Sequence, residues 1–118
     1  TASAVLMRAG EVVAGHELAA ERRPGVRERD QARGPANLAT TLGLTRIHDG
    51  LSLVGARAGG RVEPPTTPVD PARVRTGPRV GVSGAGGDGT AYPWRFWLDG
   101  EPTVSAYRVA RTRNGTVG

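Results

Sequence analysis

The stretch RVGVSGAGGDGTAYPWRFW, residues 79–97, decides between two fold classes for this chain. Its glycines spell G-x-G-x-x-G over residues 84–89, a pattern that dinucleotide-binding α/β folds place between a strand and a helix. The residues that follow, TAYPWRFWL at 90–98, contain Pro93 and a two-residue apolar period, which predicts a strand. A helix is therefore not expected where the pyrophosphate of a cofactor would bind. We interpret the glycines as a flexible connection between two strands and expect no cofactor.

The strand after the glycines is expected to continue into a hairpin. PWRFWLDGEPTVSAY, residues 93–107, predicts two strands joined by a turn at Asp99–Gly100. The alternation puts Trp94 and Phe96 on one face, where we expect them to lie in the core. Trp97 lies on the other face, where it could either pack in the core or offer a surface on which bases stack.

Two short helices and several short strands are expected elsewhere. Residues 15–22 contain strong helix formers, and a second helix is predicted with Pro35 as its first residue and Gly43 just past its end. Three apolar runs predict strands: AVLMRA (4–9), mostly buried, LSLV (51–54) and RVGVS (79–83).

Two segments are predicted to be loops. Residues 22–33, RRPGVRERDQAR, are rich in arginine and nearly free of apolar side chains, which predicts a mobile basic loop with nothing buried. Residues 55–71 are rich in glycine and proline without a period, which predicts a long loop. With 118 residues, the chain is long enough for one domain.

Charge and composition limit the function classes. The 16 cationic side chains are all arginine, and the net charge of +5 favours a nucleic-acid partner, although a bias toward arginine codons would explain it equally well. With no cysteine, and with His16 and His48 far apart in the chain, we expect no metal site. No apolar run approaches the roughly 18 residues of a membrane span, so we expect a cytoplasmic protein, nucleoid-associated when bound to DNA.

Five stretches, taken in order, resemble the C-terminal portion of the alkyladenine (3-methyladenine) DNA glycosylase family. They are AVLMRA (4–9), RGPANLATTLGL (33–44), DGLSL (49–53), PRVGVS (78–83) and PWRFWLDGEPTVSAYR (93–108). The resemblance implies an α+β fold with a curved, mostly antiparallel, open-barrel-like sheet and short surface helices, of which residues 1–118 would form the C-terminal portion. It also implies a monomeric enzyme of base excision repair, without metal or cofactor. Such an enzyme flips damaged purines such as 3-methyladenine out of double-stranded DNA and hydrolyses the glycosidic bond.

The resemblance assigns two catalytic positions. Arg8 would donate to the water that attacks the sugar, and the backbone carbonyl of Val80 would accept from the same water. Without the resemblance, Arg8 would be an arginine of a strand, either solvated or ion-paired. The catalytic glutamate of the family lies upstream of these stretches, so we expect the chain to be inactive alone.

Four residues are candidates for DNA contacts. Asn37 is near a predicted helix start and is preceded by Arg33, so it could contact phosphate through its side chain or through helix amides. Val82 and Ser83, in the same RVGVS stretch as Val80, are the other two candidates for DNA contacts. Two alternatives are a non-catalytic, β-rich nucleic-acid-binding module and, with weaker support, a nucleotide-cofactor protein.

Overall fold

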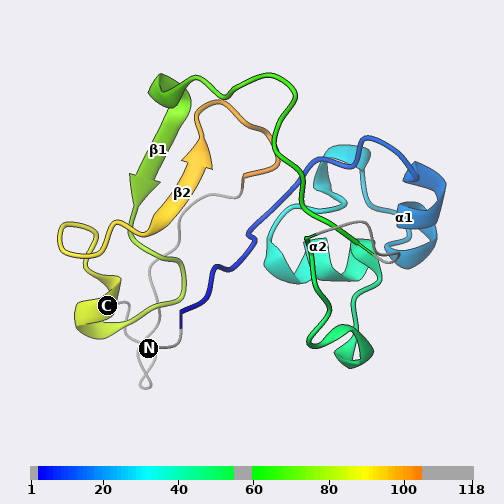
Figure 1. Ribbon diagram of the computed structural model, residues 1–118, viewed down its shortest axis with the longest axis horizontal. Helices are drawn as coiled ribbons and strands as arrows, with labels where there is room; N and C mark the ends of the chain where they lie inside the picture. The colour runs from blue at the N-terminus through cyan, green and yellow to red at the C-terminus, as the bar shows by residue number, and fades with distance from the viewer. Residues whose placement is uncertain (1–2, 55–59, 105–118) are drawn as a thin grey trace. The chain divides into compact units, whose positions relative to one another are not determined.

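The computed structural model describes residues 3–54 and 60–104, which fall into two units, Thr1–Val69 and Asp70–Gly118 (Figure 1). The first unit contains α1 (His16–Arg22), the 3-10 helix η1 (Glu28–Asp30), α2 (Pro35–Leu42) and the 3-10 helix η2 (Arg46–His48). The second contains the 3-10 helix η3 (Pro71–Arg73), β1 (Val74–Gly77), the 3-10 helix η4 (Gly84–Gly87) and β2 (Arg95–Leu98). The described residues thus form a small α+β structure, as predicted.

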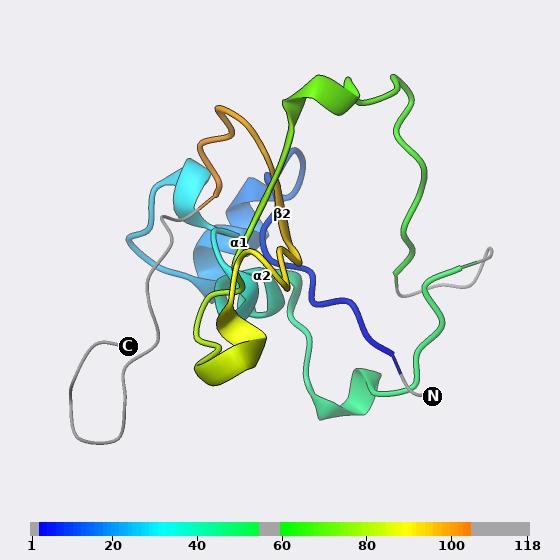
Figure 2. The same ribbon diagram turned by 90° about the vertical axis from the view of Figure 1, so that its left-hand side faces the viewer.

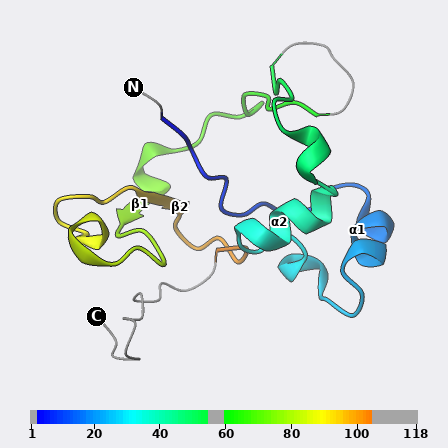
Figure 3. The same ribbon diagram turned by 90° about the horizontal axis from the view of Figure 1, so that it is seen from below.

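The first unit is built on α1 and α2, which pack against each other (Figure 3). α2 begins with Pro35, where the missing N–H costs no helical hydrogen bond, and ends at Gly43, whose φ of 69° stops the helix. The N–H of Leu44 then donates to the carbonyl of Ala39 at 2.9 Å, a typical closure after a left-handed glycine. Both helices lie where the sequence predicts them.

The interior of the first unit is small and largely polar. Ala19 and Ala32 are each 3% exposed, and the Gln31 side chain is buried to the same degree, at 2%. Thr41, 6% exposed, donates from Oγ1 to the carbonyl oxygen of Gln31 at 2.5 Å. A hydrogen bond of this kind is needed because a buried polar group without a partner costs stability.

The basic segment 22–33 is more ordered than the sequence predicts. Nη1 of Arg23 donates to the carbonyl oxygens of Asp30 at 2.6 Å and of Gln31 at 2.7 Å. The Asp30 carboxylate accepts ion pairs from Arg27 at 3.1 Å and from Arg33 at 3.5 Å. The expectation that nothing in this segment is buried is wrong, because Gln31 and Ala32 are buried where the Thr41 hydroxyl of α2 donates to the Gln31 carbonyl.

The second unit is built on β1 and β2, which pair antiparallel with Val74 opposite Leu98. The N–H of Asp99 donates to the carbonyl of Arg73 at 2.8 Å and extends the pairing by one step. η3 leads directly into β1, and η4 lies near the opposite end of the sheet (Figure 2). Over residues 70–104, the sheet has these two strands and is not closed, so its curvature and its likeness to a barrel are not confirmed.

The glycine-rich segment is a compact turn. Gly84–Gly87 form η4, and a Cβ added to Gly87 would overlap the carbonyl of Val82. A Cβ added to Gly89 would lie 2.8 Å from the ring of Pro78. The glycines therefore permit close packing of the backbone, which corrects the expectation of a flexible connection. β2 follows them, as the sequence predicts, in the place where a dinucleotide fold would have a helix.

The predicted strands at 4–9, 51–54 and 79–83 are wrong. Val5 is 88% exposed in an irregular segment, and residues 80–81 form a turn in which Gly81 has a φ of 75°. The partner of β2 is β1, at 74–77, where the sequence analysis predicted no strand. A strand needs a neighbour with free N–H and C=O groups, and an apolar run does not supply one.

The aromatic positions also differ from expectation. Trp94 is 58% exposed and Phe96 57% exposed, so neither lies in a core, whereas Trp97 is half-buried. The physical reason is that no second layer covers this face of the two-stranded sheet within the described residues. The turn at Asp99–Gly100 is present, with a φ of 78° at Gly100, but residues 101–104 form no strand. The rest of the predicted second strand, residues 105–107, lies outside the described residues.

Candidate functional site

Arg8 lies in an irregular segment of the first unit, before α1. Two residues later the N–H of Gly10 donates to the carbonyl of Ala32 at 3.1 Å, which anchors this segment beside the buried turn. The Arg8 side chain is half-buried, and its Nε and Nη1 atoms are shielded from solvent. Because a guanidinium stays protonated at any ordinary pH, the structure places a permanent positive charge in a partly desolvated setting.

Arg33 and Asn37 are brought together at the start of α2. Nδ2 of Asn37 donates to the carbonyl of Arg33 at 2.8 Å, so this side chain serves the local backbone. The Arg33 guanidinium lies 3.5 Å from the carboxylate of Asp30. A phosphate contact from Arg33 would compete with that ion pair, and one from Asn37 would use the second N–H of its Nδ2 group or the backbone amides.

Val80, Val82 and Ser83 share the loop between β1 and η4, in the second unit. Val80 is 47% exposed and Ser83 is exposed, whereas Val82 is half-buried with its carbonyl against Gly87. Within the described parts of the chain, no hydrogen bond reaches the carbonyl oxygen of Val80. That oxygen can accept a hydrogen bond from a water molecule. Arg8 belongs to the first unit and this loop to the second.

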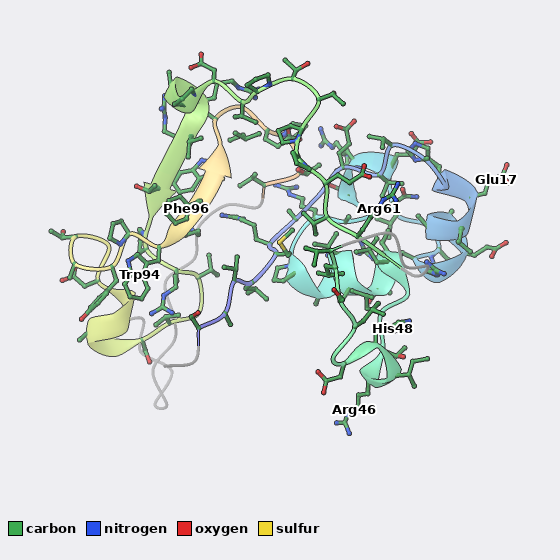
Figure 4. The ribbon with its side chains drawn as sticks, viewed as in Figure 1. Glu17, Arg46, His48, Arg61, Trp94 and Phe96 are labelled. Carbon is green, nitrogen blue, oxygen red and sulfur yellow. The ribbon has the colours of Figure 1, made fainter. Side chains whose placement is uncertain are left out.

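An arginine that the sequence analysis did not single out lies beside the same loop. The guanidinium of Arg79 is 5.3 Å from the centre of the Trp94 ring, and its Nη2 donates to the carbonyl of Gly86 at 3.1 Å. Trp94, labelled in Figure 4, is in turn in edge-to-face contact with Tyr92, with ring centres 5.1 Å apart. The signal that could have found this group is the arginine at the start of RVGVS, close in sequence to four aromatic residues. A cation on an exposed aromatic ring suits stacking with a base.

The described residues contain neither a cluster of metal ligands nor a helix that could span a membrane. Over residues 3–54 and 60–104, no three histidine, aspartate or glutamate side chains gather in a way that could hold a metal ion. In the same part of the chain, no helix combines the length and the apolar character that crossing a membrane requires.

Comparison with known proteins identifies the family. The sequence pattern of the family described as "Methylpurine-DNA glycosylase (MPG)" matches residues 1–102. A protein of Streptomyces avermitilis is 50% identical over 95% of this chain and 52% of its own length. A protein of Frankia casuarinae is 48% identical over 94% of this chain and 54% of its own length. One of Mycobacterium tuberculosis is 46% identical over 92% of this chain and 50% of its own length.

All three relatives carry the name "Putative 3-methyladenine DNA glycosylase". This chain spans about half the length of these curated relatives. The match runs through the segments around Arg8, α2 and the Val80 loop, and it confirms the resemblance inferred from the sequence. The chain belongs to the methylpurine-DNA glycosylase family.

Proposed function

We propose that this chain is part of a DNA repair glycosylase that excises alkylated or deaminated purines, such as 3-methyladenine, from double-stranded DNA. The observation that carries the proposal is the family match over residues 1–102, together with relatives up to 50% identical that are named for this activity. In the reaction, a water oxygen forms a bond to the sugar carbon and the purine leaves with the electrons of the glycosidic bond. A base inside a duplex is shielded, so the enzyme flips the nucleotide out before hydrolysis.

Arg8 and Val80 are the catalytic residues that this chain would contribute. The Arg8 guanidinium donates a hydrogen bond to the attacking water and holds a neighbouring carboxylate ionised. The partial burial of Arg8 supports this role, because a charge acts more strongly where the surrounding water is excluded. The Val80 carbonyl accepts a hydrogen bond from the same water. The exposure of Val80 in a turn supports this role. The carboxylate that takes the proton of the attacking water comes from the part of the protein outside this chain. The chain alone is therefore inactive.

The DNA contacts would come from Arg33, Asn37, Val82 and Ser83. The Arg33 guanidinium would exchange the Asp30 carboxylate for a phosphate, which keeps a charge-assisted hydrogen bond in either state. Ser83 is exposed and offers a hydroxyl, and the backbone at Val82 sets the conformation of that loop. The net charge of +5 supports binding to a phosphate polymer.

The complete enzyme would be a monomer without metal or cofactor, cytoplasmic and associated with the nucleoid when bound to DNA. Its sheet would be curved and open-barrel-like, completed by the rest of the family's chain. Residues 1–118 would form the C-terminal portion of one glycosylase domain, with a basic loop at 22–33 and a loop rich in glycine and proline at 55–71.

The test is single-turnover release of 3-methyladenine or hypoxanthine from duplex DNA. The chain is assayed alone and after co-expression with the half of the Streptomyces relative that lies outside the match. We expect release only from the co-expressed pair. In that pair, Arg8→Ala should slow release at least tenfold, about 1.4 kcal/mol of barrier, with DNA affinity nearly unchanged.

The control for Arg8 is Arg46→Ala. Arg46 is exposed in η2, and its loss removes the same charge, so the rate should stay within about twofold. Equal losses of rate and affinity in Arg8→Ala would make Arg8 a DNA contact only. Release by the chain alone would show that a carboxylate within it does the chemistry.

A second candidate is a non-catalytic nucleic-acid-binding module, favoured by the exposed Trp94 ring beside Arg79. This function would give salt-dependent binding to undamaged duplex or single-stranded nucleic acid, without base release under any pairing of halves. The release assay therefore separates the two candidates.

A further inference from the structure

A cavity of about 330 Å³ lies between the two helices of the first unit and segment 10–15. Three residues of each helix line it: Leu18, Ala19 and Arg22 of α1, and Leu38, Thr41 and Leu42 of α2. Residues three or four apart share one face of a helix, so each set faces the same space. The helices thus form two walls of the cavity, beside their mutual contact.

Small side chains leave this space open. Ala19 and Ala32 line the cavity and are each 3% exposed, so they form its buried part. Segment 10–15 forms the third wall. Its path is fixed at one end by the N–H of Gly10, which donates to the carbonyl of Ala32 at 3.1 Å, and it turns at the other end at Gly15, with a φ of 74°. Alanines beneath a backbone held in this way leave a volume that larger side chains would fill.

The cavity is lined mainly by apolar side chains. Val13, Leu18 and Leu42 border it and are 80%, 48% and 56% exposed, which makes its mouth apolar as well. The hydroxyl of Thr41 already donates to the carbonyl of Gln31. Apolar cavities stay dry and take up apolar ligands. Ligand pockets range over about 300–1,000 Å³, so a cavity of about 330 Å³ suits a small molecule.

One arginine supplies a charge for recognition. Nη1 of Arg22 donates to the carbonyl of Thr41 at 2.8 Å, and its other N–H groups remain for a further acceptor. Over residues 3–54 and 60–104, Arg22 forms no ion pair with a carboxylate. A Cβ on Gly43 would lie 2.7 Å from the Cζ of Arg22, so the glycine leaves room for the guanidinium at this place. A guanidinium with unused donors beside an apolar cavity fits a carboxylate that carries an apolar chain.

Glu11 also lines the cavity but does not exclude an anion. Its side chain is exposed, so water and salt screen its charge. The carboxylate of a ligand would contact Arg22 directly, and a charge-assisted hydrogen bond outweighs a screened repulsion. The ligand therefore enters with its chain inside the cavity and its anionic end at Arg22.

We propose that this cavity is a binding site for a small hydrophobic carboxylate of the fatty-acid type. The apolar chain lies between α1 and α2, and the carboxylate accepts hydrogen bonds from the Arg22 guanidinium. Burial of the chain supplies most of the affinity, and Arg22 selects the anion over the neutral alcohol of the same length. The inference is independent of the proposed catalysis, because it concerns binding to the first unit and no base release.

The experiment titrates the chain with octanoate and, in parallel, with octanol, which has the same chain length and no charge. Binding is read from the NMR chemical shifts of the backbone amides of Gly10, Gly15 and Leu38, which line the cavity. We expect saturable binding of octanoate with a Kd below about 1 mM, and binding of octanol at least about tenfold weaker. The titration is repeated on the chain co-expressed with the half of the Streptomyces relative that lies outside the match, where the same amides should respond.

Two variants assign the binding to the cavity. Arg22→Gln should weaken octanoate binding at least about tenfold, to the level of octanol, and leave octanol binding unchanged. Ala14→Trp brings a large ring to the cavity from an exposed position and should abolish the binding of both. The matched controls are Arg46→Gln, which removes the same charge from the exposed η2, and Ala20→Trp, at an exposed position of α1 outside the lining. Both controls should bind octanoate as the unchanged chain does.

Unchanged octanol binding in Arg22→Gln shows that the cavity is still formed, so a loss of octanoate binding reports the lost charge. The proposal is overturned if octanoate and octanol bind equally, or if Arg46→Gln weakens octanoate binding as much as Arg22→Gln does. It is also overturned if Ala14→Trp binds octanoate like the unchanged chain, or if the co-expressed pair does not bind it.

Discussion

The basic segment 22–33 and the apolar segment 4–9 end up in opposite environments from those their compositions suggest. The arginine-rich segment contains Gln31, 2% exposed, and is tied down by hydrogen bonds to backbone carbonyls. The apolar segment leaves Leu6 76% exposed and Val5 88% exposed. The difference teaches that burial in this chain follows the availability of a partner, and that hydrophobicity alone does not bring a segment inside.

The partners of the basic segment are close in sequence. Arg23 reaches Asp30 and Gln31 over seven and eight residues, and Thr41 in α2 completes the group. Such local contacts close short loops at a low entropic cost. In the apolar segment, the side chains of Val5, Leu6 and Met7 stay more than half exposed, and the backbone anchor at Gly10 lies just beyond it.

The largest effect should come from Arg23→Ala, which removes two charge-assisted hydrogen bonds to the turn. We expect the free energy of local opening of the turn to fall by about 2–3 kcal/mol, because the carbonyl of Asp30 loses this partner. Native-state hydrogen exchange of the amides around Gln31 measures this directly. Arg29→Ala is the control, because its Nε lies 4.0 Å from the Asp30 carboxylate and its side chain is 56% exposed. If Arg23→Ala lowers the free energy of local opening no more than Arg29→Ala does, the hydrogen bonds of Arg23 do not stabilise this segment.

Thr41→Val should have an intermediate effect of about 1–2 kcal/mol on the same exchange measurement. The substitution keeps the side-chain volume but removes the buried hydroxyl that donates to Gln31 at 2.5 Å. Thr40→Val is the matched control, since the exposed Thr40 hydroxyl donates only to the carbonyl of Ala36 in its own helix. If the two variants lower the free energy of local opening equally, the Thr41 hydroxyl does not stabilise the turn at 22–33.

Leu6→Ser should have the smallest effect in the isolated chain, within about 0.5 kcal/mol, because the side chain is largely in solvent. Hydrogen exchange or urea denaturation of the chain alone measures it. A loss above about 1.5 kcal/mol in the free energy of unfolding would show that Leu6 is buried in solution. Segment 4–9 would then be buried like segment 22–33, against the comparison made above.

The helices could be predicted because their signals are local. Pro35 and Gly43 mark the two ends of α2, and each acts through its own backbone conformation. The sequence predicts the turn at Gly100 for the same reason, since a glycine accepts the positive φ of this turn. The pairing of β1 with β2 could not be predicted, because 17 residues lie between Gly77 and Arg95 and VRTG has no alternating pattern.

The features of the candidate site also differ in whether the sequence could predict them. The resemblance found the segments of Arg8, α2 and Val80, and the family match confirmed the family while leaving the roles of these residues as proposals. The hydrogen bond from Asn37 to the carbonyl of Arg33 and the contact of Arg79 with Trp94 came only from the structure. Side-chain partners of this kind depend on where the backbone folds back, which residue types alone do not specify.

By itself, the sequence determined the family, the two helices and the strand that follows the glycines, because each depends on neighbouring residues or on an ordered set of motifs. The tertiary structure alone decided which strand pairs with β2, which arginines hold the turn at 22–33, and which apolar side chains remain open. Phe96 shows the reason: its alternation with Arg95 and Trp97 assigns it a face, but burial requires a second layer to cover that face.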